Sequence, residues 1–147
     1  MYESYTRQSL ADREYRSLLG TSIYVFNSNN SFLIENFLYT DFDDKRLTWY
    51  SLTDKTSGGL SKKIRGQISN TDDLNNALDL FDNLTERRNR IIHGFPVTSD
   101  NGEQILCTKD EENTQYYIDK KYMEKFIQDN EKLALLLDNI RESRSSE

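Results

Sequence analysis

The chain has 147 residues, a formal net charge of −6 and 35% hydrophobic residues, and this length is enough for one domain with a buried core. No apolar run in the sequence approaches the roughly 20 residues that cross a bilayer, so no membrane association is expected. The acidity excludes a protein that coats nucleic acid with a basic surface, but it is compatible with an enzyme that contacts nucleic acid at one patch.

Cysteine and histidine usage limits the chemistry further. Cys107 is the only cysteine of the sequence, which rules out an internal disulfide, and we interpret it as a small buried apolar residue. A single histidine and scattered carboxylates show no zinc spacing, so we expect neither a metal nor a cofactor. The first residues lack the basic-then-apolar pattern of a secretory signal. Together these features predict a cytoplasmic protein.

The first predicted element is helical and covers residues 6–39. Gly20 and the polar run Asn27–Ser31 lower its helix propensity, so we predict either one bent helix or two helices in sequence. Residues 49–60 have an irregular pattern, and residues 60–68 predict a short amphipathic helix. Ser57–Lys62 superficially resembles a phosphate-binding loop but lacks its spacing, so we interpret it as a flexible connector.

A second long helix is predicted to begin at residues 70–73, where Asn and Asp side chains and Thr71 offer oxygens for capping. It ends at Gly94 and Pro96. Residues 104–108 and 114–118 predict two short strands joined by an acidic turn.

A broad apolar stripe predicts a last helix over residues 119–141, followed by a frayed, disordered tail at 142–147. The whole pattern predicts a single, mainly α domain over residues 1–141, with a small β-hairpin before the C-terminal helix.

The most informative segment is Arg88–His93, which ends the second long helix and contains the only histidine of the chain. Histidine is the side chain best suited to proton transfer near neutral pH. Asn89 lies four residues before His93, so we expect its amide to hydrogen-bond the imidazole. Arg88 and His93 are five residues apart and point about 140° apart on a regular helix. Aiming both at one phosphate requires that the last turn opens at Gly94 or that a symmetric partner chain supplies the second half.

A purely structural interpretation is also open. A histidine at a helix C-terminus interacts favourably with the helix dipole, and a following glycine is the ordinary stop signal. Arginines beside Glu86 would then form surface ion pairs of little energetic weight. On this interpretation the protein is a small helical scaffold.

Arg88 and Asn89, followed after a three-residue spacer by His93 at the end of an amphipathic helix, resemble the HEPN superfamily (higher eukaryotes and prokaryotes nucleotide-binding). The resemblance implies an up-and-down bundle of four to five helices that forms a homodimer with a composite active site. Many such proteins are metal-independent endoribonucleases of toxin–antitoxin or antiphage systems, so an antitoxin or regulatory protein is an implied partner. One subgroup carries Tyr two residues after the His, where this chain has Phe95.

The resemblance implies that Arg88, Asn89 and His93 are catalytic residues for cleavage of single-stranded RNA, in which the 2′-hydroxyl attacks the adjacent phosphorus. His93 would act as general acid or base, Arg88 would bind the scissile phosphate, and Asn89 would orient His93 or contact the phosphate. Arg87 and Arg90 are the expected RNA-binding residues, which hold flanking phosphates. The alternative is a non-catalytic dimerisation or nucleotide/RNA-binding module of the same fold.

Three further groups are secondary candidates. A basic patch is formed by Lys62, Lys63 and Arg65. The polar residues that would line the same cleft as His93 are Asn27, Asn29, Asn30 and Glu35. A tyrosine pair that could stack on bases is Tyr116 and Tyr117.

Overall fold

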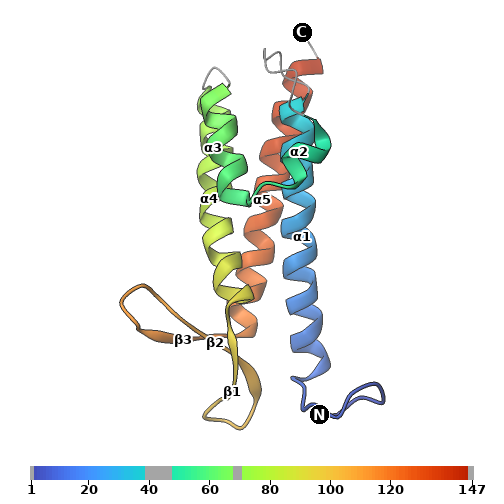
Figure 1. The fold of residues 1–147 in the computed structure, drawn as a ribbon, viewed down its shortest axis with the longest axis vertical. Helices are drawn as coiled ribbons and strands as arrows, with labels where there is room; N and C mark the ends of the chain where they lie inside the picture. The colour runs from blue at the N-terminus through green and yellow to red at the C-terminus, as the bar shows by residue number, and fades with distance from the viewer. Residues whose placement is uncertain (1, 39–47, 68–70, 146–147) are drawn as a thin grey trace.

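The computed structural model describes residues 2–38, 48–67 and 71–145 and shows a mainly helical bundle with a small sheet at one end (Figure 1). The helices α3, α4 and α5 alternate in direction, whereas α1 runs parallel to α5. The elements are α1 (Arg13–Leu38), α2 (Trp49–Thr53), α3 (Ser57–Gln67), α4 (Asp72–Ile92), β1 (Phe95–Thr98), β2 (Gln104–Lys109), β3 (Gln115–Ile118) and α5 (Lys120–Ser145). The predicted fold class is therefore confirmed.

Helix α1 is one unbroken helix, which decides between the two alternatives that the sequence left open. It begins where the Asp12 carboxylate accepts a hydrogen bond from the Tyr15 backbone N–H at 2.7 Å. The buried residue of the polar run, Asn29, is satisfied by tertiary bonds: its amide donates to the Asn130 backbone carbonyl at 2.8 Å and to the Asn130 side-chain oxygen at 3.0 Å. Contacts between α1 and α5 therefore override the low helix propensity of this segment.

The interpretation of residues 49–60 as irregular is wrong. Residues Trp49–Thr53 form α2, whose N-terminus is closed by a reciprocal pair of bonds between Thr48 and Ser51. The supposed flexible connector is the first turn of α3, because the Thr56 hydroxyl accepts a hydrogen bond from the Gly59 N–H at 3.1 Å. Two adjacent glycines lower the helix propensity of this segment, so the sequence did not indicate that a helix begins here. Residue 68, the last of the predicted short helix, lies outside the described residues.

Helix α4 has the predicted boundaries. Thr71 caps its N-terminus by accepting a hydrogen bond from the Leu74 N–H at 3.2 Å, while Asn70 lies outside the described residues. Its apolar stripe faces the core, where Phe81 stacks on Phe26 with the ring centroids 5.6 Å apart. Phe126 of α5 also stacks on Phe26, with the ring centroids 6.3 Å apart, so three phenylalanines from three helices form the centre of the bundle.

The sheet has three strands in the order β1-β2-β3, all antiparallel, where the sequence predicted two. Strand β1 was missed because it is only four residues long and contains Pro96, which cannot donate a ladder hydrogen bond and suits an edge strand. Tyr15 ties α1 to this sheet: its hydroxyl donates to the Ile118 carbonyl at 2.6 Å and accepts from the Leu106 N–H at 2.9 Å.

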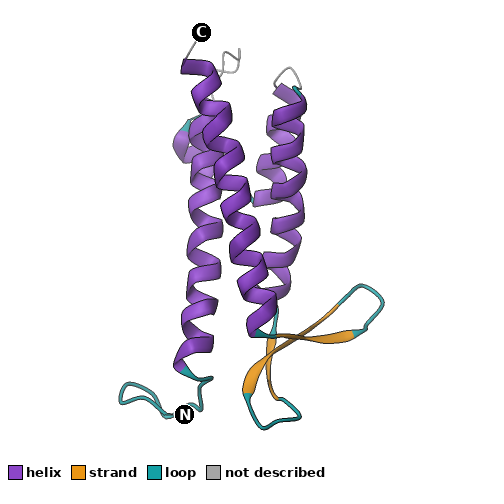
Figure 2. Ribbon diagram, turned by 180° about the vertical axis from the view of Figure 1, so that it is seen from behind, coloured by secondary structure: helices purple, strands orange, loops and turns teal. Residues whose placement is uncertain are grey.

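Helix α5 continues to Ser145, so residues 142–145 are helical and the predicted frayed tail is wrong for them. Residues 146 and 147 lie outside the described residues. Seen from behind, α5 lies between α1 and α4 and begins where the sheet ends (Figure 2). None of the helices in the described part of the chain combines the length and apolar character needed to span a membrane.

Candidate functional site

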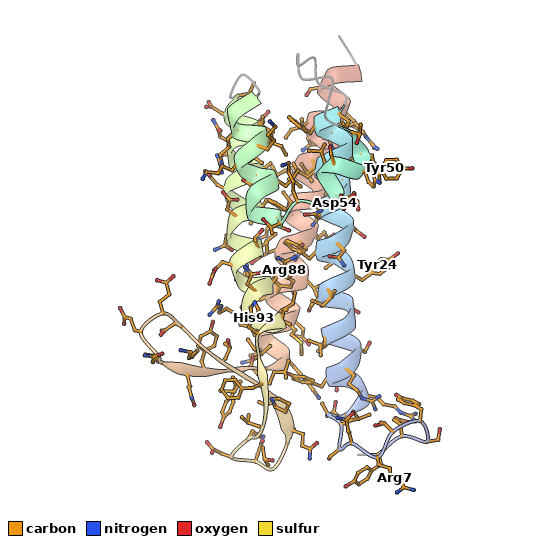
Figure 3. The ribbon with its side chains drawn as sticks, viewed as in Figure 1. Arg7, Tyr24, Tyr50, Asp54, Arg88 and His93 are labelled. Atoms are coloured by element: carbon orange, nitrogen blue, oxygen red, sulfur yellow. The ribbon has the colours of Figure 1, made fainter. Side chains whose placement is uncertain are left out.

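The predicted catalytic residues lie along the lower half of α4, with His93 where the chain leaves the helix for the sheet (Figure 3). His93 is the C-cap: its backbone N–H donates to the Asn89 carbonyl at 3.0 Å, and the Gly94 N–H donates to the Ile91 carbonyl at 3.1 Å. These bonds keep the last turn closed. The imidazole itself is exposed, and no hydrogen bond or ion pair joins it to another residue in the described ranges.

Arg88 is half-buried, and its guanidinium carbon lies 4.6 Å above the centre of the Phe26 ring. The Asn89 side-chain oxygen accepts two hydrogen bonds from it, from Nε at 3.2 Å and from Nη2 at 2.9 Å. Within residues 2–38, 48–67 and 71–145, no carboxylate forms an ion pair with Arg88. Burial without a counter-charge lowers the pKa of the Arg88 guanidinium from its usual value.

The expected hydrogen bond between Asn89 and the His93 imidazole is not formed. The Asn89 oxygen faces Arg88 instead, so this amide orients the guanidinium. An amide oxygen can satisfy two neighbouring N–H groups of one guanidinium, and this arrangement competes with the i,i+4 contact that helical spacing predicts.

Arg87 is partly buried and bound by residues of α5. Its Nη1 atom donates to the Asp129 carboxylate at 2.8 Å, and its guanidinium lies 5.5 Å from the centre of the Phe126 ring. Arg90 donates to the Lys109 carbonyl at 2.9 Å and pairs with Glu86 at 3.3 Å. Both predicted RNA-binding arginines therefore have intramolecular partners that link α4 to α5 and to the sheet.

Among the secondary candidates, Arg65 pairs with Asp79 and Asp82 and so links α3 to α4. Asn27 and Glu35 line an open depression beside Tyr24, which points away from α4 (Figure 3). Asn30 is the member of that polar set that reaches the Arg88 region, through Ser57.

The predicted tyrosine pair splits as strand alternation requires. Tyr117 is 41% exposed, whereas Tyr116 packs on Tyr122 with the ring centroids 6.3 Å apart. Cys107 is buried between its cross-strand neighbours Phe95 and Tyr117, as expected.

Comparison with protein-family models, curated proteins and solved structures finds no match to this chain. In the described part of the chain, no group of three or more His, Cys, Asp or Glu side chains is placed to hold a metal ion. The chemistry of the site is therefore argued from Arg88, Asn89, His93 and the residues around them.

One contact was missed by sequence reasoning: Ser57 lies beside Arg88 and also hydrogen-bonds Asn30, which the sequence had named as a candidate. Ser57 precedes Arg88 by 31 positions and follows Asn30 by 27, so no local spacing connects the three residues. Only the packing of α1, α3 and α4 brings them together.

Proposed function

We propose that this protein is a metal-independent endoribonuclease of HEPN type that cleaves single-stranded RNA as a homodimer, in a toxin or antiphage role. The observation that carries the proposal is the half-buried Arg88 guanidinium, which lacks a carboxylate partner within the described residues. A desolvated charge is seldom left without a counter-charge in a folded protein. A bound phosphodiester would supply that counter-charge.

In the proposed reaction, His93 removes the proton from a ribose 2′-hydroxyl, whose oxygen then attacks the adjacent phosphorus. The bond from phosphorus to the 5′-oxygen breaks, which leaves a 2′,3′-cyclic phosphate and, after protonation of the leaving oxygen, a 5′-hydroxyl. Arg88 offsets the charge that develops on the phosphate oxygens. An exposed imidazole at a helix end suits the proton transfer, because substrate and solvent can both reach it.

The closed last turn of α4 is the reason for proposing a dimer. Because the hydrogen bond from the His93 N–H to the Asn89 carbonyl is kept, Arg88 and His93 of one chain remain about 140° apart around the helix axis. Opening of the turn at Gly94, the other route to a shared phosphate, is not observed. A second copy related by a two-fold axis would bring Arg88 of one chain toward His93 of the other.

The decisive experiment incubates the protein with a single-stranded RNA oligonucleotide in EDTA. We expect products with a 2′,3′-cyclic phosphate, no cleavage of the matching DNA, and loss of cleavage in His93→Ala. Leu135→Ala is a matched control, because this side chain is also exposed but lies on α5. Cleavage that needs Mg²⁺, or that persists in His93→Ala, would contradict the proposal.

Mixing two inactive variants tests whether the site is shared between chains. If Arg88 and His93 act across a two-fold axis, subunit exchange between Arg88→Ala and His93→Ala proteins restores up to about a quarter of the wild-type activity. Half of the dimers are then heterodimers, and each carries one intact site. A mixture that stays inactive after verified exchange would show that the site does not combine the two chains in this way.

A specific observation favours a second candidate, the non-catalytic dimerisation or RNA-binding module. Arg87 and Arg90 are engaged within the protein, so fewer cations are ready to hold flanking phosphates than the sequence indicated. For that function, RNA or nucleotide would bind in a manner that depends on Arg88, without formation of cleavage products.

A further inference from the structure

Two segments that look unrelated in the sequence meet beside Arg88. The Ser57 hydroxyl, at the start of α3, donates a hydrogen bond to the Asn30 side-chain oxygen of α1 at 3.0 Å. The same hydroxyl oxygen lies 3.5 Å from Nη1 of Arg88, which is long for a hydrogen bond. Ser57 is only 5% exposed, so its placement is fixed by the packing around it.

The direction of these contacts is set by the chemistry of the hydroxyl. A serine has one O–H donor, and in this structure that donor points at Asn30. The lone pairs of the Ser57 oxygen are therefore left to accept, and the nearby Arg88 Nη1 group is a donor. Asn30 thus fixes the orientation of Ser57, and Ser57 in turn limits where Nη1 can lie.

If the long contact between Nη1 and Ser57 is counted, Asn89 and Ser57 together use three of the five N–H groups of the guanidinium. Asn89 takes Nε–H and one N–H of Nη2, while Ser57 takes one N–H of Nη1. One donor is left on each of the two terminal nitrogens. Two free donors on neighbouring nitrogens are what a guanidinium needs to bind two oxygens of one phosphate group.

We propose that Asn30 and Ser57 are positioning residues for Arg88: they hold its guanidinium so that the two remaining N–H groups face a phosphodiester. This proposal rests on the proposed function for its substrate, although the positioning itself is a property of the free protein. It assigns a role to a polar residue of α1 and to the first turn of α3. Neither residue touches the reacting atoms.

The variant Ser61→Ala is the control that distinguishes a positioning role of Ser57 from a role in packing alone. It lies one turn further along α3, is 2% exposed, and its hydroxyl has no hydrogen-bond partner among the described residues. Ser61→Ala and Ser57→Ala therefore remove the same atom from the same helix at similar burial. Only Ser57→Ala removes a contact with Arg88.

The first measurement follows the Arg88 Nε–H signal in ¹H–¹⁵N NMR spectra without RNA, identified by its loss in Arg88→Lys. The nearby Phe26 ring makes this signal sensitive to the placement of the guanidinium. We expect Ser57→Ala and Asn30→Ala to shift the signal and to speed its hydrogen exchange about fivefold, as loss of a contact near 1 kcal/mol would do. Ser57→Thr, which keeps the hydroxyl, and Ser61→Ala should leave it in place.

The second measurement is the affinity for a single-stranded 2′-O-methyl ribooligonucleotide, which lacks the attacking hydroxyl. Ser57→Ala and Asn30→Ala should each weaken binding about fivefold, with recovery in Ser57→Thr and no change in Ser61→Ala. Because Asn30 is only half-buried on α1, its variant remains informative if Ser57→Ala does not fold.

The outcomes separate the two proposals. An unchanged Arg88 signal in folded Ser57→Ala and Asn30→Ala proteins would overturn the positioning role, whatever happens with RNA. Unchanged RNA affinity in Arg88→Lys would instead overturn the proposed function, while the NMR result would still decide whether Ser57 and Asn30 hold the guanidinium.

Discussion

Arg87 and Arg88 are neighbours on α4, and each places its guanidinium over a phenylalanine ring of the core, but only Arg87 has a carboxylate partner within the described residues. Burial raises the pKa of the Asp129 carboxyl, yet hydrogen bonds from Lys125 and Arg87 outweigh it and hold that pKa below its usual value. The Arg87 charge is thus compensated, whereas the Arg88 charge is not. This contrast supports a structural role for Arg87 and is the basis for the proposal that Arg88 binds a ligand.

Replacing each arginine by methionine tests that assignment, because methionine preserves the packing of the methylene groups and removes the charge. Arg87→Met should lower the free energy of unfolding by about 2 kcal/mol, since it takes a partner from the buried Asp129. Arg88→Met should leave it unchanged or raise it by up to about 1 kcal/mol, since an uncompensated charge is lost.

Urea unfolding followed by circular dichroism measures both changes. A large loss of stability in Arg88→Met, comparable to that in Arg87→Met, would show that Arg88 has a structural role. The same two proteins should show the opposite order in RNA affinity, with Arg88→Met the more strongly affected.

Asn89→Asp provides a counter-charge within the chain. A carboxylate at this position would accept the two Arg88 hydrogen bonds that the amide oxygen accepts now, and bonds to a carboxylate are stronger. We expect the free energy of unfolding to rise by about 1 kcal/mol while RNA binding falls, because the phosphate must compete with the new ion pair.

The test measures stability and RNA affinity on the same preparations of Asn89→Asp and wild-type protein. Asn83→Asp is the control, since it adds the same charge on α4 beside Arg87. Unaltered RNA affinity in Asn89→Asp would indicate that Arg88 does not bind the phosphate.

Sequence patterns located α4 and α5 well because these depend on local signals, whereas α1 begins at Arg13 and not at the predicted residue 6. Thr71 and Gly94 bound α4 at both ends, and regular apolar spacing lies between them. The Arg88–His93 segment was placed at the end of that helix for the same reason. The elements that were not predicted have weak local patterns: α2 is five residues long, and β1 contains a proline.

The surroundings of the site could not be predicted, because they depend on contacts between distant segments. Helical spacing placed Asn89 near His93, but Arg88 is the adjacent residue and its charged guanidinium is a competing hydrogen-bond donor. The partners of Arg87 and Arg88 come from α5, α3 and α1. No pattern within one helix indicates which of two adjacent arginines will meet a carboxylate.

Glycine substitutions at two positions should act in opposite directions. A Cβ at Gly94 would lie 3.1 Å from the Ile91 carbonyl oxygen and 3.2 Å from Cβ of Leu106. Gly94→Ala should therefore lower the free energy of unfolding by about 1–2 kcal/mol. A Cβ at Gly20, within α1, meets no described atom within 4 Å, so Gly20→Ala should stabilise the protein by about 0.5–1 kcal/mol.

Thermal unfolding of the two alanine variants checks this pair. Because Gly94 sets the path from His93 into β1, Gly94→Ala should also reduce RNA cleavage, whereas Gly20→Ala should not. A Gly94→Ala protein with wild-type stability would mean that the close contacts with Ile91 and Leu106 relax without cost.

Alkaline pH should lower the free energy of unfolding through Tyr122, whose hydroxyl donates to the Arg87 carbonyl at 3.1 Å. Burial raises the pKa of Tyr122 to about 12 in the folded state, above the value near 10 expected for an unfolded chain. Between these values the unfolded state loses its proton first, so the stabilisation is complete below about pH 10 and declines as pH rises toward about 12. The contribution of Tyr122 to the slope of the free energy of unfolding against pH approaches about 1.4 kcal/mol per pH unit, which corresponds to a difference of about one bound proton between the two states.

Urea unfolding between pH 9 and pH 11.5 tests this prediction in wild type and Tyr122→Phe. The variant should be less stable near pH 9 by about 1 kcal/mol, because it lacks the bond to the Arg87 carbonyl, and its stability should decline less steeply above about pH 10. Tyr24→Phe is the matched control, since it removes the same hydroxyl from a side chain that is 75% exposed. Equal slopes in wild type and Tyr122→Phe would show that Tyr122 keeps an ordinary pKa and does not tie α5 to α4.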